Sequence, residues 1–356
     1  MIRLGIIGLG QAAQILHLPN LEKLTDAFHL TAVADISAEL VSYIGDKYRV
    51  ANRFSDGAEL IRCPDVDAVM ILCGGDHAKY AIAALEAGKH VFIEKPMTLS
   101  PENAERLIAV KRQHPELVAM VGYCRRYNDS FLKMKELLQA DSRPISYVRA
   151  RTIILEGPWY LANTWHEKKA ADLPPVDREA MQEKMFREYR AILGQDATEA
   201  KIWAYMLLTA SGCHILSAVR ELIGLPREIR SAVLSPTGMQ FTLTCVYDGF
   251  NMVFEEMNDQ SVVEFDESIE IYQGDRKMSL KYDSPYIHYL PTQLTVSELE
   301  DGQAKTVVYG PQYHDMFFNE LLEFHQCIAE KRAPKCDVFD AAEDVSWFLD
   351  IAGQMR

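Results

Sequence analysis

The first 35 residues carry the pattern that most restricts the fold of this chain. A short apolar run, Ile2–Ile7, leads into the glycine turn Gly8–Ala13, and a second apolar run further along the chain ends at Asp35. This order of strand, glycine turn, helix, strand and acidic residue is typical of a dinucleotide-binding βαβ unit. In such a unit Gly8 permits the tight turn, and Gly10 lets backbone N–H groups approach a pyrophosphate. The pattern therefore predicts a parallel sheet that binds a nucleotide at its edge.

A nicotinamide dinucleotide is the cofactor that this unit predicts. Asp35 can accept hydrogen bonds from the ribose hydroxyls, which favours NAD. NADP is the second choice, because a carboxylate repels its 2′-phosphate and no arginine follows at Ile36 or Ser37. A glycine turn in another kind of α/β protein is the alternative. The turn residues expected to contact the cofactor are Gly8, Gly10, Gln11, Ala12 and Ala13.

Composition restricts the class of protein and of partner. With 356 residues the chain is too long for one ordinary hydrophobic core, which predicts two domains. A net charge of −14 argues against a nucleic-acid or anionic-membrane partner, since both would repel the protein. No apolar run approaches the roughly twenty residues that span a bilayer. The cysteines are scattered and the histidines lack metal-ligand spacing, so we expect a cytoplasmic protein without a structural metal.

The pattern of apolar and polar residues changes after residue 122. Before it, apolar runs alternate with helix-like stretches, which predicts a Rossmann NAD(P)-binding domain over residues 1–122 with a doubly wound parallel sheet. Residues 123–356 are expected to form an α+β domain for substrate binding and oligomerisation. The elements expected there are a strand at 145–155, a polar segment at 157–198, a helix at 199–223, an antiparallel meander at 229–309 and helices at 313–330 and 339–354.

The predicted sheet of the second domain is large, open and mostly antiparallel, with helices on one face. Its other face, if apolar, would be a good contact surface between copies, so we expect a homodimer or homotetramer. The last helix can pack back on the first domain.

Two further motifs carry a resemblance to a known family. The stretch Val66–Pro96 contains an apolar run, a histidine-bearing loop, a helix and then Glu94-Lys95-Pro96 after the next strand, and Gly122–Tyr127 follows the first domain. Together with the glycine turn and Asp35, these motifs resemble the Gfo/Idh/MocA family, which includes glucose–fructose oxidoreductase and inositol dehydrogenase. The resemblance extends over nearly the whole chain. It implies an NAD(P)-dependent dehydrogenase or reductase that acts on CH–OH groups of sugars or polyols.

The resemblance also implies roles for two loops at the sheet edge. Glu94 would contact the ribose on the nicotinamide side. Pro96 would follow a cis peptide bond that brings Lys95 into the substrate site, where its ammonium would hydrogen-bond the reacting oxygen. The alternatives are a surface lysine for Lys95 and a role in capping or packing the loop for His77. The residues that would contact the cofactor from these loops are Cys73, Gly74, His77, Glu94, Lys95 and Pro96.

One position departs from the family pattern. Members carry an Asp and, four residues later, a His on a helix of the second domain; here the His is His214 and the Asp position is Ala210. His214 would accept the proton of the substrate hydroxyl, or else pack as a core histidine. Gly212 is expected to keep space open beside it. One polar residue of the 157–198 segment is expected to replace the missing carboxylate. The candidates there are His166, Lys168, Asp172, Asp177, Arg187, Tyr189 and Asp196.

Substrate contacts are expected from both domains. Arg126 and its neighbour Arg125 can instead form ion pairs between the domains. The aromatic residues around His166 either line a sugar pocket or anchor the long segment. The expected substrate-binding residues are Lys95, Tyr123, Arg126, His166 and His214, of which Lys95 and His214 would be catalytic.

Three functions are compatible with these observations. The leading one is hydride transfer between a nicotinamide and a secondary alcohol or ketone of a sugar, polyol or related cyclic compound. The second is cleavage of a glycoside through transient oxidation by bound NAD. The third is a nucleotide-binding regulator without turnover, which Ala210 favours and which Lys95 and His214 disfavour.

Overall fold

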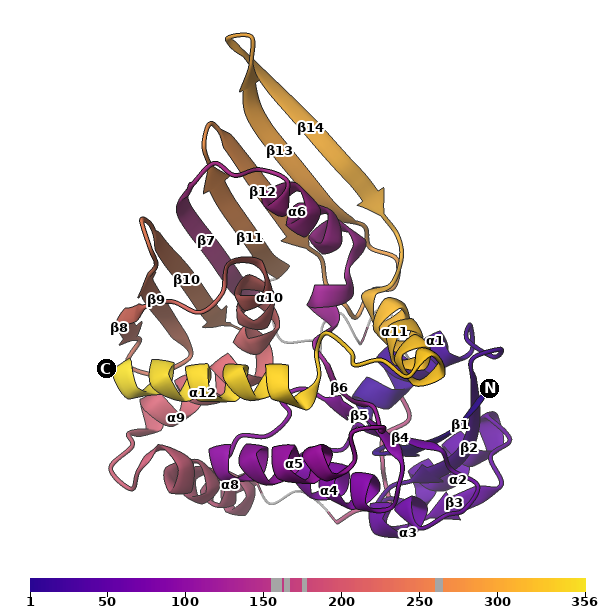
Figure 1. The fold of residues 1–356 in the computed structure, drawn as a ribbon. Coiled ribbons are helices and arrows are strands. Elements are labelled where there is room, and N and C mark those ends of the chain that lie inside the picture. Colours follow the sequence, from indigo (N-terminus) through magenta and orange to yellow (C-terminus); the bar gives the residue numbers. More distant parts are fainter. Residues whose placement is uncertain (155–161, 163–166, 175–177, 260–264) are drawn as a thin grey trace. The chain divides into compact units, whose positions relative to one another are not determined.

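A computed structural model describes residues 1–154, 162, 167–174, 178–259 and 265–356 (Figure 1). The chain divides into two compact units, each assembled from segments that are distant in the sequence. Unit 1 comprises Met1–Tyr123, Thr164–Arg178 and Phe317–Val345, and unit 2 comprises Cys124–Asn163, Glu179–Met316 and Ser346–Arg356.

Unit 1 contains a six-stranded parallel sheet in the order β3-β2-β1-β4-β5-β6 (Figure 1). The central strand β4 and the edge strand β6 are buried along their whole length, as expected for a sheet covered by helices on both faces. The doubly wound parallel sheet predicted from the alternation is therefore confirmed. Its strands are β1 (Ile2–Ile7), β2 (Phe28–Ala34), β3 (Asn52–Phe54), β4 (Ala68–Ile71), β5 (His90–Glu94) and β6 (Ala119–Gly122).

Three helices of unit 1 begin after residues whose side chains accept hydrogen bonds from free backbone N–H groups: Ser37, Asp56 and Ser100. Ser37 accepts a hydrogen bond from Leu40 N at 3.1 Å, and Ser100 accepts one from Asn103 N at 3.3 Å, directly before the first-turn proline Pro101. The helices are η1 (Ala12–His17, a π-helix), α1 (Leu18–Leu21), α2 (Ala38–Lys47), α3 (Gly57–Ile61), α4 (Ala78–Glu86), α5 (Pro101–Gln113), most of α11 (Met316–Glu330) and the first half of α12 (Val338–Gln354).

Helix α11 packs on the parallel sheet although it lies near the end of the sequence. The ring of His17 is fully buried between Phe92 of β5 and Phe317 of α11, with both ring centroids 5.6 Å away in edge-on geometry. Phe324 packs against Phe92 at 5.7 Å. Burial lowers the pKa of His17 to about 3, so this ring is neutral and acts as an aromatic core residue.

Unit 2 contains an eight-stranded sheet in the order β14-β13-β12-β11-β7-β10-β9-β8. The expectation of a simple antiparallel meander is wrong at one point: β7 is inserted between β10 and β11 and runs parallel to β10. All other pairs are antiparallel. The strands are β7 (Ile145–Ile154), β8 (Glu228–Leu234), β9 (Gln240–Val246), β10 (Asn251–Asn258), β11 (Phe265–Gln273), β12 (Arg276–Tyr282), β13 (Thr292–Glu300) and β14 (Gln303–Gln312).

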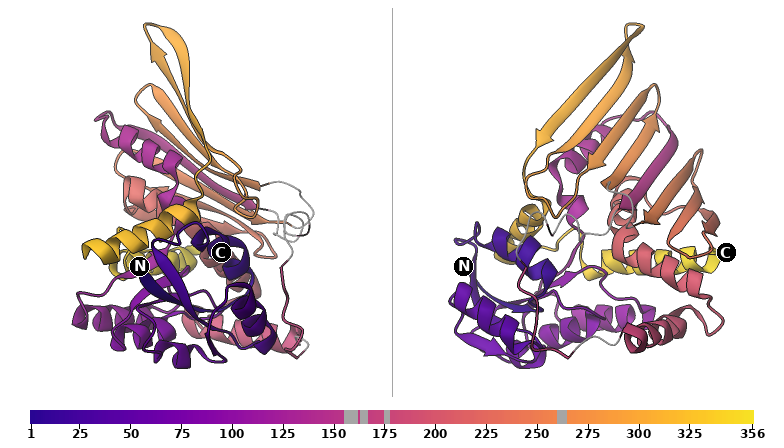
Figure 2. Two further views of the ribbon diagram at one scale, coloured as in Figure 1. Left: turned by 90° about the vertical axis from the view of Figure 1, so that its right-hand side faces the viewer. Right: turned by 180° about the vertical axis from the view of Figure 1, so that it is seen from behind.

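Helices cover one face of this sheet, as Figure 2 shows for α6 and α10. The helix expected over residues 199–223 is confirmed as α9, η3 and α10 in direct succession. Its 18-residue window with mean hydropathy 1.5 is apolar enough to cross a bilayer, contrary to our expectation, but 78% of that window is buried inside the protein. The helices are η2 (Cys124–Tyr127), α6 (Asp129–Gln139), α8 (Arg178–Leu193), α9 (Glu199–Leu207), η3 (Leu208–Gly212, a π-helix) and α10 (Cys213–Ile223).

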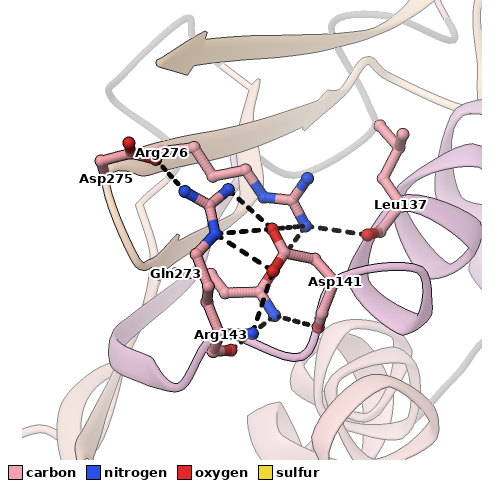
Figure 3. Close-up of polar contacts among 6 residues, drawn as sticks. All are labelled: Leu137, Asp141, Arg143, Gln273, Asp275 and Arg276. Atoms are coloured by element: carbon pink, nitrogen blue, oxygen red, sulfur yellow. Dashed lines mark hydrogen bonds and ion pairs between the residues drawn. The ribbon is translucent and has the colours of Figure 1, made fainter. Parts of the chain in front are cut away.

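A polar cluster fastens the turn between α6 and β7 to the hairpin between β11 and β12 (Figure 3). Arg276 donates to Leu137 O at 2.8 Å and to Gln273 Oε1 at 2.5 Å, and it lies 3.3 Å from Asp141 Oδ2. Gln273 in turn donates to Asp141 O and Arg143 O, both at 2.9 Å. These contacts fix the start of β7 at the position where it enters the sheet.

Candidate functional site

The glycine turn has the geometry that a bound pyrophosphate requires. Gly8 has φ +93°, and a Cβ there would lie 2.4 Å from Cys73 N, so only glycine fits. A Cβ at Gly10, in contrast, would meet no atom within 4 Å, and the same holds at Gly74 and Gly75. The backbone at this edge therefore borders open space, and the described residues fit a dinucleotide.

Asp35 follows β2 and is held against the glycine turn. Its Oδ2 accepts a hydrogen bond from Leu9 N at 2.7 Å, and its Oδ1 accepts one from Ser37 N at 2.8 Å. A carboxylate has further lone pairs for ribose hydroxyls beyond these two contacts. The next residue, Ile36, is 77% exposed, which is unusual for a large apolar side chain. Its exposure offers an apolar surface beside the ribose position, a feature that the sequence pattern did not indicate.

The loop after β4 is fastened to the segment that follows β5. His77 Nδ1 lies 2.8 Å from Pro96 O and Nε2 lies 2.7 Å from Cys73 O, so the ring bridges two backbone carbonyls. Asp76 accepts hydrogen bonds from Thr98 Oγ1 at 2.8 Å and from Asn103 Nδ2 at 2.6 Å. His77 thus has the loop-packing contacts that were its alternative role, and Asp76 is a positioning residue that the sequence analysis did not single out.

Glu94 and Lys95 occupy the carboxyl end of β5, and the expected cis peptide bond between Lys95 and Pro96 is present. The Glu94 carboxylate lies over β6, where a Cβ at Gly122 would come within 2.8 Å of its Oε2. Burial raises the pKa of Glu94 to about 7, although the positive charge of Lys95 opposes that shift. A titratable carboxyl beside a half-buried lysine at a strand end is typical of functional sites.

Part of the long polar segment lies along the same sheet edge, which we did not expect. Lys168 N donates to Gln14 Oε1 at 3.0 Å, and Gln14 Nε2 donates to Lys168 O at 3.0 Å and to Leu9 O at 2.8 Å. Lys168 also forms an ion pair with Glu39. Asp172 Oδ1 accepts a hydrogen bond from Ser37 Oγ at 2.5 Å. Residues 167–172, the strap, are therefore bound to unit 1 beside the glycine turn and Asp35.

The second expected catalytic residue, His214, lies in unit 2 one residue after a π-helical turn. The helix Glu199–Ile223 begins at Thr198, which caps Lys201 N at 3.2 Å, and ends at Gly224 with φ +77°. The π-helical turn η3 interrupts it and ends at Gly212, with Cys213 between it and His214, a placement common near functional sites. His214 is half-buried, and its Nδ1 lies 3.9 Å from Cys124 Sγ.

The residues between Ala210 and His214 do not have the surroundings that we expected. Ala210 is exposed, but Gly212 faces the sheet: a Cβ there would lie 2.0 Å from Glu256 Oε2. The expectation that Gly212 keeps open space beside His214 is therefore wrong, because the carboxyl of Glu256 fills that space. Ser211 Oγ contacts Glu256 Oε1 at 2.5 Å and Leu207 O at 3.0 Å.

Glu256 is a buried acid that the sequence analysis missed. Burial raises its pKa well above the ordinary value, and Ser211 opposes that shift. Ser211 Oγ is the hydrogen-bond partner of Glu256 Oε1, whereas Glu256 Oε2 lies against Gly212 and has no hydrogen-bond partner among the described residues. The only signal in the sequence is a Glu at an inward position of an alternating strand, where an apolar residue is the rule.

The two arginines after β6 are buried within unit 2. Arg125 Nε donates to Glu267 Oε2 at 2.6 Å, and both residues are at most 2% exposed. Arg126 pairs with Glu221 and lies 3.3 Å from Ser217 Oγ. Both arginines thus form ion pairs inside one unit, and their guanidinium groups have carboxylate partners. Tyr123, the other predicted substrate contact here, is fully buried. His166 lies outside the described residues.

Comparison with known proteins agrees with the site in unit 1. Residues 2–123 match the Gfo/Idh/MocA family model, described as an oxidoreductase family with an NAD-binding Rossmann fold. An inositol 2-dehydrogenase/D-chiro-inositol 3-dehydrogenase from Shouchella clausii is 33% identical over 142 residues, 39% of this chain and 41% of that protein. A myo-inositol 2-dehydrogenase from Thermotoga maritima is 34% identical over 139 residues. The match thus extends over about two fifths of these relatives, 41% in each case.

Solved structures extend the likeness of fold to the whole chain. A 3-ketoreductase from Actinomadura kijaniata, crystallised with TDP-benzene and NADP in an open conformation, superposes with a TM-score of 0.73 at 19% identity and covers 100% of this chain and 98% of its own. A UDP-N-acetylglucosamine 3-dehydrogenase from Acidithiobacillus ferrooxidans superposes with a TM-score of 0.72 at 20% identity, covering 99% and 97%. Residues 2–123 in unit 1 are thus similar to the NAD-binding Rossmann domain of the Gfo/Idh/MocA oxidoreductase family, and the solved structures extend the likeness of fold to the rest of the chain.

Proposed function

We propose that this protein is an NAD-dependent oxidoreductase that transfers a hydride between the nicotinamide and a secondary alcohol or ketone of a sugar, polyol or related cyclic compound. The observation that carries the proposal is the sheet edge of unit 1. Open glycine backbone, Asp35 and the Glu94-Lys95 pair lie together there at the ends of parallel strands. The inositol dehydrogenases among the relatives support the substrate class.

The chain's own residues would divide the work as follows. Gly10 and the start of η1 would bind the pyrophosphate, Asp35 the adenosine ribose, and Glu94 the second ribose. NAD, when bound, supplies the carbon that accepts the hydride. Lys95 would donate a hydrogen bond to the reacting oxygen, which favours the alkoxide-like charge that develops as the hydride leaves. His214 would accept the hydroxyl proton.

The loop contacts explain how Lys95 would be oriented. The His77 bridge to Pro96 O and the Asp76 bridge to Thr98 hold the backbone on the carboxyl side of Lys95. A lysine side chain is flexible, so a fixed backbone reduces the number of positions its ammonium can occupy. We expect Asp76→Ala to lower kcat without abolishing NADH binding.

A substrate panel tests the proposal. Purified protein is incubated with NAD and a set of inositols, aldoses and nucleotide sugars, and NADH formation is followed by absorbance. The proposal expects a substrate whose oxidation is lost in both Lys95→Ala and His214→Ala. Unchanged turnover in both variants would contradict the assigned roles. Product formation without net NADH would instead indicate glycoside cleavage with transient oxidation, and NAD binding without any turnover would indicate the regulator.

Two properties of the whole protein are also proposed here. We infer a cytoplasmic location from the scattered free cysteines. A homodimer or homotetramer through the sheet of unit 2 is the expected assembly, since the described helices that pack on that sheet, such as α6 and α10, lie on one of its faces in Figure 2. Light scattering of the purified protein measures its mass and tests the second inference.

A further inference from the structure

The strap, residues 167–172, brings a carboxylate to the end of β2. Asp172 Oδ1 accepts a hydrogen bond from Ser37 Oγ at 2.5 Å, and Asp172 Oδ2 accepts one from Glu39 N at 3.1 Å. Ser37 and Asp172 are 135 residues apart in the sequence. Further contacts hold the strap in place: Ala171 N donates to Glu39 Oε2 at 2.8 Å, and the Lys168 backbone is paired with Gln14.

This carboxylate lies at the N-terminus of α2, a helix of ten residues. Backbone N–H groups and the helix dipole at such a terminus favour an anion. Here the anion is supplied by the chain itself. The Ser37 hydroxyl and the N–H groups of Glu39 and Ala38 lower the pKa of Asp172, so the group is charged at neutral pH.

The same terminus adjoins the expected position of the adenosine ribose. Ser37 N donates to Asp35 Oδ1 at 2.8 Å, while Ser37 Oγ donates to Asp172. One residue thus links the carboxylate that would bind the ribose hydroxyls with the carboxylate on α2. In Rossmann domains the acidic residue after the second strand binds the 2′-hydroxyl, and NADP adds a phosphate at that oxygen. The donors at the start of α2 are the neighbouring groups that could hold such a phosphate.

We propose that Asp172 is a specificity-determining residue for the cofactor: its carboxylate occupies the anion position at the start of α2 that the 2′-phosphate of NADP would take, and so selects NAD. This inference rests on the proposed function, because it requires a nicotinamide cofactor on this edge. Asp172, which lies on a distant segment of the chain, would thus exclude the 2′-phosphate of NADP in addition to Asp35. Repulsion between two anions and competition for the same donors act in the same direction.

Calorimetric titration of the purified protein with NADH and NADPH tests the inference without any substrate. We expect the wild-type protein to bind NADH more tightly. Asp172→Asn removes the charge at nearly constant shape and should tighten NADPH binding about tenfold, while the Kd for NADH changes less than about twofold. Asp172→Glu keeps the charge and should retain the wild-type preference. Asp46→Asn, an equal change of charge in the last turn of α2, is the matched control and should leave the ratio of the two Kd values unchanged.

The outcomes separate the two proposals. If NADH binds but Asp172→Asn leaves the ratio of the Kd values at the wild-type value, or if the wild-type protein binds NADPH as tightly as NADH, the role of Asp172 is overturned, while hydride transfer with a nicotinamide cofactor at this edge still stands. If the wild-type protein binds neither dinucleotide, the proposed function fails and this inference fails with it.

Discussion

Charged side chains have different surroundings in the two units. The difference distinguishes side chains that a ligand can reach from side chains that stabilise the fold. At the sheet edge of unit 1, Asp35 and Lys95 are half-buried and stand beside glycines that border open space. In unit 2, Arg125, Glu267 and Glu256 are at most 2% exposed and have partners within the same unit. Groups of the first kind remain accessible to a ligand. Groups of the second kind are buried with partners inside the unit and stabilise its fold.

Removing the Lys95 ammonium should have the largest effect on turnover. We expect Lys95→Ala to lower kcat by about a hundredfold to a thousandfold, because the loss of one positioned hydrogen-bond donor to a developing oxyanion typically costs that much. The melting temperature should change by only a few degrees at most. Steady-state kinetics and thermal unfolding of the same sample measure both. A Lys95→Ala protein that unfolds at markedly lower temperature would show that Lys95 is structural, and the comparison between the units would then be broken.

Removing one partner of the buried ion pair between Arg125 and Glu267 should lower the stability of the protein, in contrast to Lys95→Ala. Burial alone would lower the pKa of Arg125, but the adjacent Glu267 outweighs it and the net shift is upward. Glu267→Gln leaves the guanidinium buried without a carboxylate, and we expect a loss of about 3 kcal/mol in the free energy of unfolding. Urea titration measures it. Asp248→Asn breaks the exposed pair with Arg227 and should cost less than about 0.5 kcal/mol. Equal costs would contradict the distinction.

Gly212 extends the comparison between buried and accessible positions to a residue without a charge. Its missing Cβ makes room for Glu256, so we expect Gly212→Ala to destabilise the protein by about 1–3 kcal/mol. The matched control is Gly353→Ala in α12, where a Cβ meets no atom within 4 Å and alanine is the better helix former. Gly353→Ala should be neutral or stabilising. A neutral Gly212→Ala would show that Glu256 does not occupy that space.

Glu94 should produce a smaller effect that depends on pH. Its folded-state pKa of about 7 lies above the ordinary value of 4.5, so its protonated form is favoured by folding. The contribution of Glu94 to stability is present at low pH and is lost as pH rises through about 7, by about 1–3 kcal/mol. Urea titrations at a series of pH values measure it against Glu94→Gln, which should lack this loss. Parallel pH profiles for the two proteins would contradict it.

The sequence predicted the parts of the molecule that depend on neighbouring residues. The glycine turn after the first strand and Asp35 after the second are local patterns, and each has the predicted local structure. Strand β3 was missed because three residues show no periodicity, and α8 was missed because its residues are mostly polar. In both cases the contacts that stabilise the element come from elsewhere in the chain.

Features that depend on long-range pairing could not be predicted. The insertion of β7 beside β10 depends on a register that no single strand encodes. The same is true of the buried acid Glu256 and of Asp172, whose partners lie on distant segments. Site residues near a motif were therefore within reach of sequence reasoning. The position of the long polar segment, and with it the contacts of Lys168 and Asp172, could not be predicted in this way.

Binding of NADH to Gly10→Val tests the central claim most directly. A side chain at Gly10 points into open space, so the variant should fold with an unchanged melting temperature while its side chain fills the position of the pyrophosphate. Calorimetric titration should show 1:1 binding of NADH to the wild-type protein and a loss of at least about tenfold in affinity for Gly10→Val. Equal affinity in the two proteins would contradict a dinucleotide at this edge.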